Sequence, residues 1–167
     1  MKYTIQKHLG LSGHQASIYV ILNESEQETS LTKFVRENTS NFPDEVKDLL
    51  KRLRAIGRAT GARKQYFKLE EGKPGDGVCA LYDNPDKNLR LYCILNSLDN
   101  VIIGGGGQKP KGMKSFQESD KLTEENYFLR AVSQLFSERL KNKDIYYTNR
   151  GMDLGGDLTF EDIDLRH

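Results

Sequence analysis

Residues 87–111 contain the side chains best suited to binding a phosphate. An apolar run over residues 89–95 contains Arg90 and Tyr92, and a second run over 101–103 leads into four glycines and then two lysines. Side chains alternate along a strand, so Arg90 and Tyr92 stand on one face and the leucines on the other. The plainer alternative is an amphipathic strand with one solvated face.

RNA cleavage fits these residue types. RNA can be broken by its own 2′-hydroxyl, which needs aligned atoms, a proton acceptor, a proton donor and cations around the phosphate, but no metal ion. Arginine supplies a fixed two-pronged donor, lysine supplies a mobile one, and tyrosines can stack on splayed bases. If the apolar strand faces pack on helices, five side chains gather on the opposite face: Tyr66, Lys68, Tyr82, Arg90 and Tyr92.

Other chemistries find less support in the sequence. The glycines at 104–107 lack the GxxxxGK[ST] pattern and no helix follows them directly, so a flexible exit from an edge strand is expected rather than a phosphate loop. Three scattered histidines and the absence of a CxxC pattern predict neither metal nor cofactor. Cys79 and Cys93 lie inside apolar runs and are expected to be reduced core residues.

Charge is unevenly distributed along the 167 residues, whose net charge is +1. Residues 47–68 contain eight Lys or Arg and one acid, a net of +7, whereas residues 151–167 carry five acids and one arginine, a net of −4. A basic middle suggests an anionic partner, and a solvated helix face balanced by acids elsewhere is the alternative. The acidic tail either folds across the basic site or adds an edge strand through its short apolar run at 158–163.

The order of elements predicts an α+β fold. A strand or hairpin over 2–23 precedes a short helix capped at Thr29 or Ser30, and a longer helix opens at Pro43. Strands over 65–70, 78–83, 89–95 and 101–103 follow, and Thr123 is expected to cap a last long helix. We therefore expect a helical pair packed on an antiparallel sheet of four or more strands, plus a long C-terminal helix.

Composition indicates a soluble protein. Mean hydropathy is −0.66, and no apolar run approaches the roughly 18 residues that a membrane span needs. The first eight residues lack the apolar stretch of a secretory signal. Cytoplasmic localisation without a membrane partner is the expectation.

Four features carry a resemblance to a known family. The helical pair ends in Gly57 and Gly61; YFKLEEG at 66–72 forms a strand entering a turn; LRLY at 89–92 bears the arginine; and VII at 101–103 is followed by QKPK at 108–111. Over roughly residues 16–114 this order resembles the RelE/ParE superfamily, HigB-like members included, which are toxins of bacterial toxin–antitoxin pairs. The resemblance implies a domain over 1–114 and a helical, acidic extension over 115–167 packed on it.

The resemblance implies a metal-independent mRNA endoribonuclease, acting free or on the ribosome and held by an antitoxin. Arg90 becomes a phosphate ligand, Lys109 or Lys111 a phosphate stabiliser, and Tyr92 or Tyr82 a stacking or proton-transfer group. The implied RNA-binding residues are Lys51, Arg54, Arg58, Arg63, Lys64, Tyr66 and Lys68. Because Arg90 alternates out of the apolar face, Arg90→Ala is expected to leave stability nearly unchanged.

The sequence also departs from the family pattern. Four glycines replace the usual apolar residues before the lysines, and about fifty further residues, including a full helix, follow the resembling region. That extension could cover the site or replace an antitoxin contact. The alternative function is therefore a non-catalytic protein of the same fold that binds a protein partner such as a topoisomerase.

Overall fold

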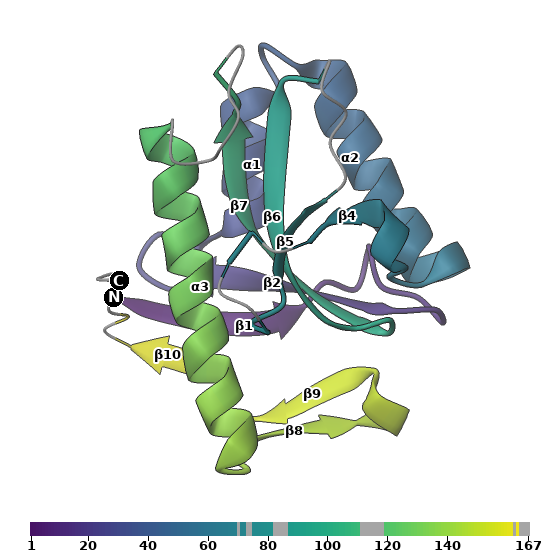
Figure 1. The fold of residues 1–167 in the computed structure, drawn as a ribbon, viewed down its shortest axis with the longest axis vertical. Helices are drawn as coiled ribbons and strands as arrows, with labels where there is room; N and C mark the ends of the chain where they lie inside the picture. Colours follow the sequence, from purple (N-terminus) through teal and green to yellow (C-terminus); the bar gives the residue numbers. More distant parts are fainter. Residues whose placement is uncertain (70, 73–74, 82–86, 111–118, 162, 164–167) are drawn as a thin grey trace.

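The computed structural model of the chain describes residues 1–69, 71–72, 75–81, 87–110, 119–161 and 163. Its centre is a mixed, mostly antiparallel sheet with helices on both faces (Figure 1). The strands of this sheet are β1 (Lys2–Lys7), β2 (Ser17–Asn23), β3 (Glu28–Thr29), β4 (Phe67–Lys68), β5 (Val78–Leu81), β6 (Leu89–Ser97), β7 (Asn100–Gln108) and β10 (Thr159–Glu161).

Strand order in the sheet is β10-β1-β2-β7-β6-β5-β4, with β3 paired to β2. Strands β2 and β7 run parallel, and all other neighbours are antiparallel. A separate hairpin joins β8 (Ile145–Thr148) to β9 (Asp153–Gly156). The expected α+β class is confirmed. The predicted hairpin of residues 89–103 is present as β6 and β7, although β7 extends further than predicted.

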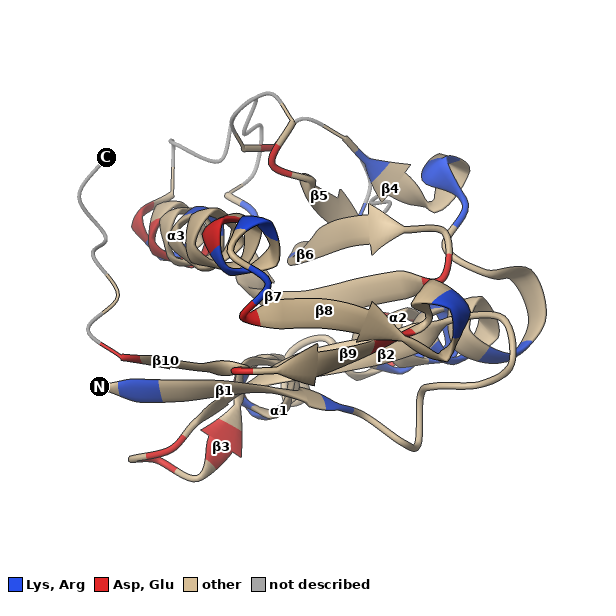
Figure 2. Cartoon of the chain, turned by 90° about the horizontal axis from the view of Figure 1, so that it is seen from below, with Lys and Arg blue, Asp and Glu red and all other residues tan. Residues whose placement is uncertain are grey.

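Helices cover both faces of the sheet. Helices α1 (Ser30–Asn38) and α2 (Pro43–Ala55) pack on one face, and α3 (Asp120–Lys141) packs on the other (Figure 2). Helix α2 continues into a π-helical turn, η1 (Ile56–Thr60), and a short 3-10 turn, η2 (Lys64–Tyr66), precedes β4. The apolar stripe of α2 is buried against the sheet, as its helical spacing predicts.

Helix starts follow local capping chemistry. The Thr29 hydroxyl accepts a hydrogen bond from the Thr32 amide, and Pro43 opens α2, both as predicted. The prediction for α3 was wrong: Ser119, not Thr123, caps it, because the Ser119 hydroxyl accepts from the Leu122 amide. The Thr123 hydroxyl instead donates to the Ser119 carbonyl inside the first turn.

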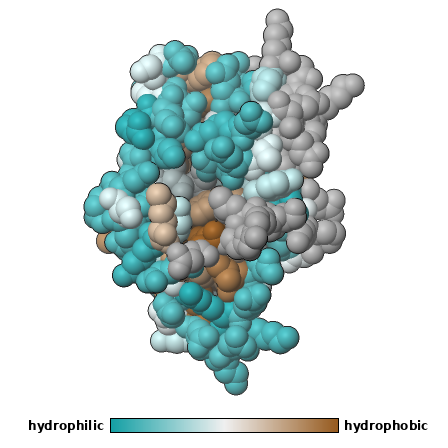
Figure 3. Space-filling model, turned by 90° about the vertical axis from the view of Figure 1, so that its left-hand side faces the viewer, coloured by the Kyte–Doolittle hydropathy of each residue, from teal (hydrophilic) through white to brown (hydrophobic). Residues whose placement is uncertain are grey.

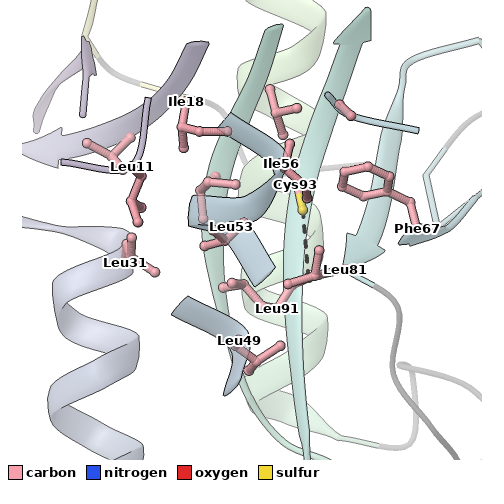
Figure 4. Packing of buried hydrophobic residues seen from close by; sticks show 14 of the residues in the cluster. Leu11, Ile18, Leu31, Leu49, Leu53, Ile56, Phe67, Leu81, Leu91 and Cys93 are labelled. Carbon is pink, nitrogen blue, oxygen red and sulfur yellow. Dashed lines mark hydrogen bonds between the residues drawn. The ribbon is translucent and has the colours of Figure 1, made fainter. Parts of the chain in front are cut away.

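The core between the sheet and the α1–α2 pair is apolar. Leu53, Leu91 and Cys93 are fully buried there, and Figure 4 shows them converging from α2 and β6. Both cysteines are free and buried, and they face one another across β5 and β6. A hydrogen bond with Cys79 and, second to it, burial raise the pKa of the Cys93 thiol.

The glycine run lies inside β7, which corrects two expectations. Residues 104–107 were expected to form a flexible loop leaving an edge strand, but they are buried strand residues between neighbours in the sheet. A Cβ at Gly105 would collide with a Glu125 carboxylate oxygen, and one at Gly104 would lie 3.0 Å from Leu129. A Cβ at Gly106 would collide with the Arg90 carbonyl oxygen, so the close approach of β6 requires glycine there, while side chains of α3 crowd Gly104 and Gly105.

The described part of the tail forms an edge strand. Strand β10 pairs with β1 through Lys2–Glu161, Tyr3–Phe160 and Thr4–Thr159, at the edge of the sheet remote from β6. Its described residues therefore do not cover Arg90; residues 162 and 164–167 lie outside the described part. None of the described helices combines the length and apolar character that crossing a membrane requires.

Candidate nucleic-acid interface

Two of the predicted catalytic side chains, Arg90 and Tyr92, lie on the sheet face against which α3 packs. Arg90 is 5% exposed and Tyr92 is fully buried. Their strand alternation is as predicted, since both point away from the α1–α2 face, but that second face is packed rather than open. The expectation of an exposed Arg90–Tyr92 face is therefore wrong, because α3 packs against this face.

Polar contacts hold α3 over this face. The fully buried Asn126 side chain donates through Nδ2 to the Glu71 carbonyl at 2.7 Å, and the Ser133 hydroxyl donates to the Asp76 carbonyl at 2.6 Å. The Asn126 Oδ1 atom is buried and has no hydrogen-bond partner among the residues that the structure describes. Burying a polar atom unpaired costs free energy, so this interface is less favourable per buried area than an apolar one.

Two further cations lie near Arg90. Arg90 is paired with Gly107 across β6 and β7, and the Lys109 amide donates to the Asn88 carbonyl at 2.7 Å, so Lys109 lies one alternation further along the same face. The stem of Lys121 lies over Gly107. Sequence reasoning missed Lys121, because only the packing of α3 brings it to β7.

Lys121 is a compensated charge. Its Nζ lies 3.0 Å from Glu125 Oε1 and 3.3 Å from Glu37 Oε1. Partial burial acts to lower the pKa of Lys121, but the hydrogen bond and charge of Glu125, with those of Glu37, outweigh it and leave the pKa raised. Tyr82 and Lys111, the other predicted catalytic residues, lie outside the described part of the chain.

The predicted RNA-binding cations are exposed. Lys51, Arg54 and Arg58 follow one another at helical spacing along α2 and η1, and Arg63 and Lys64 lie at η2, where Figure 2 shows the basic residues of this region. Lys47, which was not among the predicted contacts, is exposed one turn before Lys51 on α2. We call these six residues the basic surface. In the described residues none of them takes part in an ion pair.

The neighbouring charges do not neutralise the basic surface. Asp48, the one acid between residues 47 and 68, pairs with Arg52 at 3.1 Å. Lys68, also predicted to bind RNA, is exposed but lies 3.3 Å from Glu71 Oε1. Tyr66 is half-buried against the apolar core. Lys68 is therefore the weakest of the predicted contacts.

One tight contact fixes the end of the basic surface. A Cβ at Gly57 would collide with the Leu11 carbonyl oxygen, so only glycine lets the loop between β1 and β2 pack on η1. That loop is held by the amides of Gln15 and Ala16, which donate to the Gly57 carbonyl. The Arg58 guanidinium donates to the Gly10 carbonyl at 2.8 Å. Arg58 is thus held in place more firmly than a free surface arginine.

The described residues contain no group of three or more His, Cys, Asp or Glu side chains placed to hold a metal ion. No family model, curated protein or solved structure matches the chain. What remains is the geometry of the site itself, which offers an exposed row of cations on one side of the molecule and a buried arginine on the other.

Proposed function

We propose that this protein binds RNA through its basic surface, as the toxin of a toxin–antitoxin pair. One observation carries the proposal: Lys51, Arg54, Arg63 and Lys64 are exposed and take part in no ion pair within the described residues, while Arg52 engages the one acid of this stretch. Cations gathered on one surface attract anions, and a phosphate backbone supplies evenly repeated anions.

The element order supports the RelE/ParE-type part of the proposal. A strand, β2, is followed by two helices on one face of the sheet and then by β4, β5, β6 and β7, which are antiparallel neighbours in sequence order. Strand β7 returns beside β2 to complete the sheet. This order is similar to the strand, helical pair and antiparallel sheet of the superfamily. It implies an antitoxin, mRNA and the ribosome as partners.

RNA cleavage is the second candidate function. The shared face of Arg90 and Lys109 favours it, since the two cations stand on adjacent strands. Cleavage requires α3 to leave that face, because Arg90 and Tyr92 barely reach solvent beneath it. With α3 in place the chain fits the non-catalytic alternative, and an apolar patch on the α3 side offers a surface for a protein partner (Figure 3).

Salt-dependent binding tests the main proposal. Fluorescence anisotropy with a labelled single-stranded RNA would compare the full chain with the double variant Lys51→Gln/Arg54→Gln. The log–log salt slope is expected to fall by about 1.4, or about 0.7 for each phosphate that is no longer neutralised. The matched control is Lys141→Gln/Lys143→Gln, which removes two exposed cations at the far end of α3. No RNA binding, or an equal loss of affinity in both variants, would contradict the proposal.

Expression without its partner separates the toxin roles. The toxin proposal predicts that the chain inhibits growth when expressed alone and that co-expression of its antitoxin restores growth. Cleavage additionally predicts RNA fragments with 2′,3′-cyclic phosphate ends. Inhibition without such fragments would support the non-catalytic alternative, and an absence of inhibition would contradict the toxin assignment.

A further inference from the structure

A hollow of about 300 Å³ lies between the end of α2 and η2, beside the basic surface. Its lining residues are Arg52, Ala55, Ile56, Thr60, Gln65, Tyr66 and Leu81. The volume falls at the lower end of the range for ligand pockets, which suits one small flat group rather than a large cofactor.

The apolar part of the hollow is rigid. Ile56 and Leu81 are 2% and 1% exposed and belong to the packed core. The Tyr66 side chain packs against the same core and is only partly buried, so its ring is held in place while part of it remains accessible. A fixed, half-exposed aromatic ring is a preformed stacking surface, because it loses little conformational entropy when a second ring binds.

The polar part of the hollow supplies hydrogen-bonding groups. The Arg52 Nε atom lies 3.1 Å from Asp48 Oδ2, which fixes the direction of the guanidinium group. Gln65 contributes an amide that can both donate and accept. The Thr60 hydroxyl donates to the Gly61 carbonyl at 2.9 Å, so it offers its oxygen as an acceptor. Donors and acceptors beside an aromatic ring match the polar edge and the flat face of a nucleobase.

Exposed cations precede lining residues of the hollow in the chain, on two different elements. Lys51 precedes Arg52 on α2, and Arg63 and Lys64 precede Gln65. All three are exposed and take part in no ion pair within the described residues. A base inside the hollow therefore places its flanking phosphates among cations from both elements.

We propose that this hollow binds one unstacked base of a single-stranded RNA, with Tyr66 stacking on the base and Gln65 and Arg52 facing its polar edge. This inference rests on the proposed RNA binding and names its substrate class. A base must leave its stack to enter the hollow, so the site selects single strands over duplexes.

Two substitutions test the hollow against one RNA sequence, offered as a single strand and as a duplex. Tyr66→Leu removes the stacking ring, and Ala55→Met fills the hollow from an exposed helix position without removing a core side chain. Each is expected to weaken single-strand binding about 5- to 150-fold, the range for removing one stacked base. Tyr66→Phe keeps the ring and is expected to retain the affinity.

The outcomes separate this inference from the proposal beneath it. If the full chain binds no RNA at any salt concentration, the proposed function fails. If it binds RNA but Ala55→Met, with its thermal unfolding unchanged, binds the single strand as tightly as the full chain, the hollow does not hold a base. Equal affinity for single strand and duplex would overturn the inference in the same way.

Discussion

The two faces of the central sheet are packed by different means. The face under α1 and α2 is closed by aliphatic and aromatic side chains, with Leu53 and Leu91 fully buried at its centre. The face under α3 also buries apolar side chains, but with them it buries Arg90, Asn126 and Ser133. Buried polar groups stabilise a packed face less than apolar groups of the same area.

The two faces of the sheet have different roles in this account. The α1–α2 face anchors α2 firmly, and the outer side of α2 carries the basic surface in a fixed arrangement. The α3 face keeps charged and hydrogen-bonding groups beneath a helix that is itself attached by bonds from side chains to carbonyls. We therefore propose that binding occurs on the outside of α2, and we expect the α3 face to be the one that opens at lower free-energy cost.

The largest expected loss of stability comes from truncating a buried side chain between the sheet and the α1–α2 pair. Leu53→Ala should lower the free energy of unfolding by about 2–5 kcal/mol, because it leaves a cavity that its neighbours cannot fill. Leu129→Ala, at an equally buried position on α3, should cost less, since α3 also buries the polar side chains of Asn126 and Ser133 and this face is expected to open more easily. Urea unfolding of both variants measures the contrast, and a larger cost for Leu129→Ala would contradict it.

Arg90→Ala is expected to cause a smaller loss of stability. This differs from the expectation drawn from the sequence, which was that stability would be nearly unchanged. Because the side chain is 5% exposed, Arg90→Ala should lower the free energy of unfolding by about 1–3 kcal/mol as packing and hydrogen bonding are removed. Arg90→Met keeps most of the stem and should cost less. Thermal unfolding compares the two, and an unchanged melting temperature for Arg90→Ala would show that α3 does not cover Arg90 in solution.

The smallest effect is a loosening of the β8–β9 hairpin in acid. Partial burial acts to raise the pKa of Asp153, but hydrogen bonds from Ser17, Lys7 and Asn149 outweigh it and hold the pKa below its ordinary value of 3.8. The carboxylate thus stabilises the fold above about pH 4, and this contribution disappears as pH falls through the lowered pKa.

Asp153→Asn isolates that contribution. The difference in unfolding free energy between the full chain and the variant should be constant from neutral pH down to about pH 4 and should shrink below it. Denaturant unfolding at several pH values measures this difference. A difference that grows as the pH falls would contradict the assignment.

The sequence predicted those features of the strands and helices that depend on neighbouring residues in the chain. Alternation placed Arg90 and Tyr92 opposite Leu91 correctly, and Pro43 marked the start of α2. What covers Arg90 could not be predicted, because α3 reaches β6 through tertiary packing that leaves no short-range pattern. The glycines at 104–107 misled for a similar reason: tertiary packing overrides their weak strand preference, because the Arg90 carbonyl of β6 leaves no room for a side chain at Gly106 and side chains of α3 crowd Gly104 and Gly105.

The basic surface was predictable and the hollow beside it was not. Lys51, Arg54 and Arg58 recur at helical spacing, which places them on one exposed face from sequence alone. The hollow needs Arg52 and Tyr66 brought together by the turn that ends at Gly61, whose φ of +75° only glycine adopts readily. The direction of that turn depends on the close approach of η1 to the loop between β1 and β2.

The most direct test of the central claim is a map of backbone amide shifts during titration with single-stranded RNA. RNA binding at the basic surface predicts that the largest shifts fall within residues 47–68, and that α3 and the β8–β9 hairpin change little. Shifts concentrated on α3, or no shifts during the titration, would contradict the placing of RNA binding on α2 and η2.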